Sequence, residues 1–238
     1  MTPDLTAYVA TELGAVGGSF GPAPAAWPAP RWGALYAALD AAAEPVFVVA
    51  LELIYEGYLL HYRQSRAVAL APDDAETRLL AGDCYYARGL HDIAALGDVD
   101  AVGLLARLMA ACSYLRSSAA AFAADDALWA YTMGGLAAQH AGLSATVTAA
   151  VFDELGVHLG AAGAADVPAL AADAARGLSL RDPAPLYVAL EAACASTGAS
   201  STGASSAELP RAGASDADAV VLGACPAADA PVAADPGG

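Results

Sequence analysis

Apolar residues recur every three or four positions along most of the chain, which is the spacing of an α-helix with one buried face. The first such segment carries Leu5, Tyr8, Val9, Leu13 and Val16. Helix start and stop signals divide the rest of the pattern into further segments. Their expected ranges are 32–43, 46–66, 75–96, 98–121, 127–141, 144–159, 167–176 and 184–195. The pattern therefore predicts an all-α fold of about eight or nine helices.

Proline, glycine and capping residues mark the predicted helix boundaries. Thr2 and Pro3 form an N-cap followed by proline at the first helical position. Pro45 separates the second helix from the third. Gly97 ends the fourth helix and Asp98 caps the fifth. These signals support the helical assignment independently of the periodicity.

The helical pattern stops near Ser196. The pentapeptide STGAS occupies residues 196–200 and repeats directly at 201–205, and small or polar residues then dominate to Gly238. Such a segment has too few large apolar groups to offset the entropy that is lost on ordering. We therefore expect a helical domain over residues 1–195 and a disordered low-complexity tail over residues 196–238.

Charge narrows the classes of partner. The formal net charge is −16, and all ten basic residues are arginines. An acidic chain repels nucleic-acid phosphates and anionic lipid headgroups, which excludes nucleic-acid binding and disfavours a membrane-surface role. The longest apolar stretch, Pro45–Leu60, contains Glu52 and Glu56 and is shorter than the ~20 residues of a membrane span. We expect no membrane span.

Two features that the sequence lacks bear on the cellular compartment and on metal binding. The N-terminus lacks the basic and apolar regions of a signal peptide. The four cysteines lie far apart and form no C-x-x-C pair. These features predict a cytoplasmic protein without a zinc site.

Two blocks of sequence between Leu51 and Arg88 carry the most informative pattern. The first reads LELIYEGYLLHYRQSR and the second reads RLLAGDCYYAR. They resemble the trans-isoprenyl diphosphate synthases, in which one helix reads roughly E-L-I-H-x-x-S-L-I-H-D-D-x-x-D and the next opens with L-x-G-D-Y-L-x-A. The matching residues are Glu52, Leu53, Ile54, Leu59, Leu60, His61, Leu80, Gly82, Asp83, Tyr86 and Ala87.

The resemblance implies an isoprenoid-synthase-type helical bundle that assembles as a dimer. Members of that family extend an allylic prenyl diphosphate with isopentenyl diphosphate, and their aspartate-rich motifs hold Mg²⁺ against the substrate. Some members work as a catalytic subunit with a degenerate partner. The resemblance therefore implies either a homodimer or a heterodimer with a catalytic prenyl synthase.

The chain departs from the family at the metal-binding positions. The family's first aspartate-rich motif falls on YRQSR. Tyr62 and Arg66 occupy its first and fifth positions, which lie on the same face of the expected helix. Arginine has no lone pair to offer a cation. The family's GGK-x-x-R segment has no counterpart, and Asp125-Asp126 is followed by Trp129 where a third carboxylate belongs. We therefore predict no catalytic residues of the family type and no metal cofactor, and we interpret the two aspartates as charge at the start of a helix.

Four side chains are candidates for binding a substrate: His61, Arg63, Arg66 and Asp83. Guanidinium groups pair well with phosphate oxygens, so Arg63 and Arg66 would hold a diphosphate directly. The structural alternative pairs Arg63 with Glu56, two turns earlier on the same face. His61 is at best a group at the rim of a pocket.

Asp83 has its own structural alternative. It falls on the apolar stripe formed by Leu79, Tyr86, Leu90 and Ile93. A carboxylate in that position must find a partner because burial of an unpaired charge is costly. We expect Asp83 either to line a pocket or to form a hydrogen bond or an ion pair in the core.

The leading hypothesis is a polyprenyl-diphosphate-synthase-like protein of isoprenoid biosynthesis that performs no chain elongation. It would act as an accessory subunit or bind a prenyl diphosphate. The alternatives are an active prenyltransferase or terpenoid-type enzyme that uses unrecognised residues, and a ligand-free helical scaffold. A wide apolar cavity with Arg63 and Arg66 at its mouth would favour ligand binding, whereas a solid core would favour the scaffold.

Overall fold

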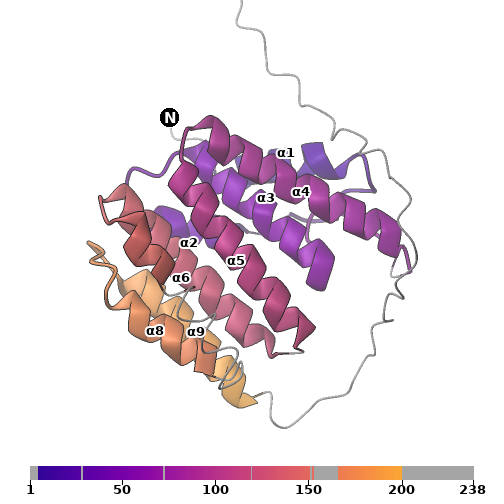
Figure 1. Cartoon of the computed structure of the whole chain (residues 1–238). Coiled ribbons are helices and arrows are strands. Elements are labelled where there is room, and N and C mark those ends of the chain that lie inside the picture. Colours follow the sequence, from indigo (N-terminus) through magenta and orange to yellow (C-terminus); the bar gives the residue numbers. More distant parts are fainter. Residues whose placement is uncertain are drawn as a thin grey trace, which may run out of the picture. The chain divides into compact units, whose positions relative to one another are not determined.

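The computed structural model confirms the predicted all-α fold (Figure 1). It describes residues 5–27, 29–71, 73–118, 120–150, 152 and 166–199, and these residues contain no β-strand. The helices are α1 (Leu5–Gly17), α2 (Trp32–Leu39), α3 (Pro45–Tyr62), α4 (Ala75–Ala95), α5 (Val99–Ser117), α6 (Phe122–His140), α8 (Val167–Ala175) and α9 (Ala184–Ala199). Residues 145–150 are also helical.

The helices form two groups that share α2. In the first group α3 packs against α4, α2 and α1, and in the second α6 packs against α9, α8, α5 and α2 (Figure 1). Because α2 contacts both α3 and α6, the two groups bury one continuous core. The site described below lies where α2 and α6 begin and α3 ends.

The two sequence blocks that carry the family resemblance fall on α3 and α4, which lie side by side. Glycines permit the close approach of these helices. A Cβ atom at Gly57 would lie 2.8 Å from the carbonyl oxygen of Gly82, and one at Gly89 would lie 2.6 Å from the carbonyl oxygen of Ala50. Both distances are too short for a real side chain, so this helix pair requires glycine at both positions.

Large aromatic rings fill the core between α2, α3 and α6. The Trp32 and Trp129 rings stack with their centroids 6.0 Å apart. Tyr55 meets them edge-on at 5.9 and 5.1 Å, and Tyr58 lies 5.9 Å from Trp129. All four side chains are buried. This part of the core is solid, in contrast to the wide apolar cavity that would have favoured ligand binding.

Several predicted boundaries are wrong. The third helix was expected to reach residue 66 but ends at Tyr62, and the sixth was expected to begin at residue 127 but begins at Phe122. The last helix continues to Ala199, past the predicted start of the tail at Ser196. Three predictions lie outside the described residues. They are the rest of the tail, the Thr2-Pro3 cap and, except for residue 152, the part of the helix predicted at 144–159 that follows residue 150.

Among the described residues no helix is both long and apolar enough to cross a membrane.

Candidate functional site

The segment after α3 is held by a buried carboxylate of α3 itself. Glu56 Oε1 accepts hydrogen bonds from the Ser65 hydroxyl at 2.6 Å and from the backbone N–H groups of Arg66 at 2.7 Å and Ala67 at 3.1 Å. The helix was expected to continue through these residues. It ends at Tyr62 instead, and Glu56 gives the freed N–H groups the partners that buried backbone donors need.

The Arg66 side chain turns back onto α3. Its Nε lies 3.2 Å from Glu56 Oε2 and its Nη2 lies 3.0 Å from Glu52 Oε2, while the guanidinium carbon stands 4.7 Å from the centre of the Tyr55 ring. Both glutamates are fully buried. The prediction that Glu56 pairs with Arg63 is therefore wrong, because the loop brings Arg66 to Glu56. Because α3 ends at Tyr62, Arg66 does not share a helix face with Tyr62.

A second buried glutamate on α3 holds the start of α2. Glu52 Oε1 accepts hydrogen bonds from the backbone N–H groups of Arg31 and Gly33, each at 2.7 Å. This anchors Arg31, whose Nη1 donates to the Tyr55 hydroxyl at 2.9 Å. Its Nη2 lies 3.1 Å from Asp126 Oδ2 on α6. Arg31 thus connects α2, α3 and α6.

Arg63, the residue that follows α3, reaches the same aspartate. Its Nη1 lies 3.5 Å from Asp126 Oδ1, and its guanidinium carbon lies 4.1 Å from the centre of the Phe122 ring. Arg31 and Arg63 therefore meet at Asp126, and Arg66 shares the Tyr55 ring with Arg31 at the end of α3. We call these three residues the arginine cluster. Their side chains are 42%, 23% and 19% exposed, so solvent reaches all of them.

Asp125 lies in the first turn of α6, as predicted for a helix-start charge, but its side chain also has partners of its own. It is fully buried, and its Oδ2 accepts a hydrogen bond from the Tyr58 hydroxyl at 2.9 Å and pairs with Arg116 Nη2 at 2.9 Å. The buried Cys112 thiol is a further, weak donor to this carboxylate. Burial raises the pKa of Asp125 to about 6, against the lowering effect of Arg116.

His61 and Asp83 form a separate pair on the other side of α3. His61 Nε2 lies 3.2 Å from Asp83 Oδ1, and the His61 ring stacks on Tyr86 with a centroid distance of 5.1 Å. Burial lowers the pKa of His61, and Asp83 opposes that shift. The Asp83 side chain is 66% exposed and Leu79 is exposed as well, whereas Ile93 is buried and Tyr86 and Leu90 pack partly buried against the core. The expected stripe of α4 is therefore buried only in part, and the ion pair of Asp83 forms at the surface instead of in the core. The buried residues of α4 are Ala81, Gly82, Cys84, Tyr85, Gly89 and Ile93.

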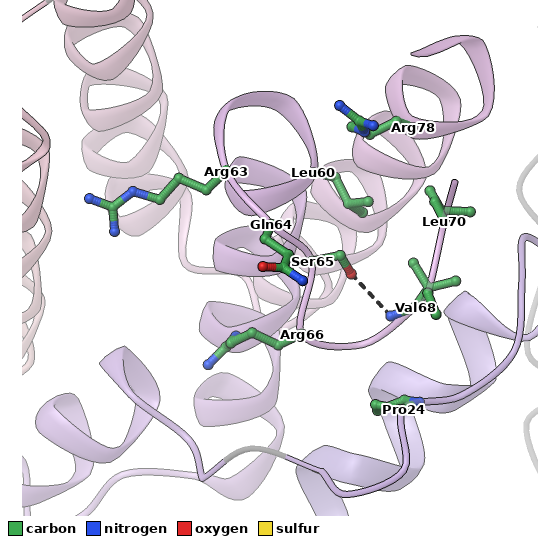
Figure 2. A pocket seen from close by; sticks show the side chains of 10 residues that line it. Pro24, Leu60, Arg63, Gln64, Ser65, Arg66, Val68, Leu70 and Arg78 are labelled. Atoms are coloured by element: carbon green, nitrogen blue, oxygen red, sulfur yellow. Dashed lines mark hydrogen bonds between the residues drawn. The ribbon is translucent and has the colours of Figure 1, made fainter. Parts of the chain in front are cut away.

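The loop after α3 also borders an open cavity of about 600 Å³. Three arginines line it, namely Arg63, Arg66 and Arg78. The other lining residues are Pro24, Leu60, Gln64, Ser65, Val68, Ala69 and Leu70. Figure 2 shows the side chains of Arg63 and Arg66 extending to one side of the loop, whereas Arg78 and Leu70 lie on the other side. The cavity therefore has arginines on both sides of the loop and an apolar wall that includes Leu60, Val68 and Leu70.

The structure brings together only part of the predicted site. Arg63 and Arg66 lie in the arginine cluster, and His61 and Asp83 lie apart from it. Within the described residues no three His, Cys, Asp or Glu side chains are grouped so as to hold a metal ion.

Comparisons of the chain with protein-family models, with curated proteins and with solved structures found no match.

Sequence analysis missed Arg31 and the pairing role of Asp126. Arg31 lies in a proline-rich segment, and its partners belong to helices that are distant in the chain. One signal was present in the sequence. Glu52 and Glu56 interrupt the most apolar stretch, and buried carboxylates require cationic or N–H partners. The two glutamates therefore predict arginine side chains near α3, but the sequence does not identify which arginines these are.

Proposed function

We propose that this chain is a polyprenyl-diphosphate-synthase-like protein that does not elongate prenyl chains and that binds the diphosphate group of a prenyl diphosphate at the arginine cluster. The observation that carries this proposal is the gathering of Arg31, Arg63 and Arg66 at the end of α3, beside a cavity with an apolar wall. Guanidinium groups offer planar, paired N–H donors that match phosphate oxygens. The apolar wall suits the first part of a prenyl chain.

The lack of chain elongation follows from the residues at the end of α3. Prenyl transfer requires metal ions that stabilise the departing diphosphate, and their ligands are carboxylates. Here the fifth position of the motif in the sequence is Arg66, and its side chain is bound to Glu52 and Glu56. A bound cation next to a guanidinium group is electrostatically unfavourable. Placing aspartates at positions 62, 63 and 66 would not recreate a metal-binding helix face, because the helix ends at Tyr62.

Calorimetric titration in the presence of EDTA tests the proposal. Inorganic diphosphate and farnesyl diphosphate are expected to bind, and farnesol is expected to bind more weakly because it lacks the anionic group. Raising the salt concentration should weaken binding by screening the charges. Arg63→Ala should lower the affinity about tenfold, whereas Arg181→Ala, a matched change at an exposed arginine outside the cluster, should leave it unchanged.

Two outcomes would overturn the proposal. If no diphosphate binds, the arginine cluster is purely structural. If the purified protein alone forms prenyl products that are lost on chelation, other carboxylates hold a metal ion and the protein is an active enzyme. The proposed accessory role is tested by purifying the protein from its native host, where a catalytic prenyl synthase is expected to accompany it.

A ligand-free helical scaffold is the second candidate function. It is favoured by the ion pairs within the site, because Arg31, Arg63 and Arg66 each contact a carboxylate of the same chain. In that case the arginines serve only to neutralise buried glutamates and aspartates. Arg66→Ala would then unfold or strongly destabilise the protein, and no anion would change its melting temperature.

A further inference from the structure

Asp126 stands between two arginines of the cluster. Its Oδ2 lies 3.1 Å from Arg31 Nη2, and its Oδ1 lies 3.5 Å from Arg63 Nη1. The side chain of Asp126 is 20% exposed, so solvent reaches the point where the three charges meet. Asp126 therefore occupies the place at which a dissolved anion would meet Arg31 and Arg63.

The two contacts of Asp126 are unequal. The distance to Arg31 is that of a charge-assisted hydrogen bond, whereas 3.5 Å to Arg63 is beyond the usual range. Oδ1 is buried and has no hydrogen-bond partner among the described residues. A short aspartate side chain therefore matches only one of the two guanidinium groups. A diphosphate carries more oxygens over a wider span, so it can satisfy both.

Arg31 and Arg63 have supports that do not depend on Asp126. Arg31 donates to the Tyr55 hydroxyl, and its guanidinium carbon lies 4.3 Å from the centre of the Trp32 ring. Arg63 lies 4.1 Å from the centre of the Phe122 ring. Cation–π contacts of this kind help to hold a guanidinium group in place. Both cations therefore stay close to their present positions when Asp126 moves away.

We propose that Asp126 is an internal competitor for the anion site, and that a diphosphate group binds by displacing it from Arg63 and Arg31. The choice of diphosphate rests on the proposed function, whereas the competition rests on the contacts of Asp126. The carboxylate keeps the arginines neutralised when the ligand is absent, and it limits the affinity for the ligand. Neutralising Asp126 therefore strengthens anion binding, although most changes within a binding site weaken it.

The test is calorimetric titration of inorganic diphosphate into wild-type protein and two variants of the whole chain. Asp126→Asn should tighten binding about fivefold, because it removes one competing carboxylate. The matched control is Asp92→Asn, which removes one negative charge and one arginine ion pair, that with Arg88, away from the site. It should leave the affinity unchanged. Arg31→Ala in the Asp126→Asn background should remove the gain. If Asp126→Asn does not fold, Asp126→Ser provides the same neutralisation.

The possible results separate this inference from the proposed function. Tighter binding by Asp126→Asn supports the inference, and so does binding that appears only in that variant. If wild-type protein binds diphosphate and Asp126→Asn binds it equally or more weakly, the inference is wrong and the proposed function stands. If neither protein binds diphosphate, both are wrong.

Discussion

Two helices each bury carboxylates at this site, and they satisfy them in different ways. On α3, all four carboxylate oxygens of Glu52 and Glu56 have partners. One oxygen of each accepts backbone N–H groups, and the other pairs with Arg66. On α6, Asp125 uses one oxygen for Tyr58 and Arg116, while its Oδ1 has no N–H or O–H donor among the described residues.

This difference separates carboxylates that hold the structure from carboxylates that can change their charge or their partners. The α3 carboxylates accept backbone donors from two loops, so the loops and the charges satisfy each other, and these carboxylates are structural. Within the described part of the chain, the α6 carboxylates have side-chain partners only and are incompletely satisfied. Burial raises the pKa of Asp125 to about 6, and its partners offset only part of this shift. The part of the site that can change its charge or its partners is therefore the start of α6.

The largest effect is expected on α3. Glu56→Ala removes the acceptor of three donors and leaves Arg66 with one carboxylate fewer, so it should lower the free energy of unfolding by about 3–5 kcal/mol. Glu56→Gln keeps an acceptor oxygen and should cost less. Urea unfolding at neutral pH measures both. A loss below about 1 kcal/mol for Glu56→Ala would mean that the loop does not depend on this carboxylate.

A smaller effect, dependent on pH, is expected at Asp125. Its pKa of about 6 in the folded protein is above the ordinary value of 3.8. The raised pKa means that its contribution to stability is fully present below pH 3.8 and is lost as the pH rises through about 6. The loss amounts to about 3 kcal/mol.

Asp125→Asn removes the titrating group, so comparison with this variant isolates the contribution of Asp125 to the pH dependence of the unfolding free energy. The difference in unfolding free energy between wild-type protein and the variant should therefore be largest below the ordinary pKa and should shrink by about 3 kcal/mol towards neutral pH. Urea unfolding at a series of pH values measures this. A difference that is constant with pH would show that Asp125 does not titrate in this range.

The smallest effect is expected at Asp83, a carboxylate that is neither buried nor held by backbone donors. Its side chain is 66% exposed and pairs only with His61 among the ion pairs described here. Exposed pairs contribute little because water and salt screen them, so Asp83→Asn should change the free energy of unfolding by less than about 0.5 kcal/mol. The same urea titration measures it. A loss of unfolding free energy as large as that of Glu56→Ala would contradict the expectation that burial determines how much the removal of a carboxylate destabilises the protein.

The helices and most of their starts could be predicted from local sequence, because capping and periodicity involve residues a few positions apart. Asp74 and Asp98 cap α4 and α5 by accepting hydrogen bonds from Thr77 and Ala101, as expected of aspartates at those positions. The end of α3 could not be predicted in this way. It depends on Glu56 binding a loop ten residues later, and no propensity favours ending a helix before Arg63.

The site itself was only partly predictable. Arg63 and Arg66 were singled out as candidate substrate-binding residues, and both lie just after α3, but the partner of Arg63 was assigned by spacing along a helix that does not extend that far. Arg31 joins them from 32 residues upstream of Arg63, and Asp126 joins from 63 residues downstream. Periodicity says which residues face inward, since it depends only on neighbours along the chain. Which buried charge meets which is decided by the packing of α2, α3 and α6, because an ion pair depends on distance in space.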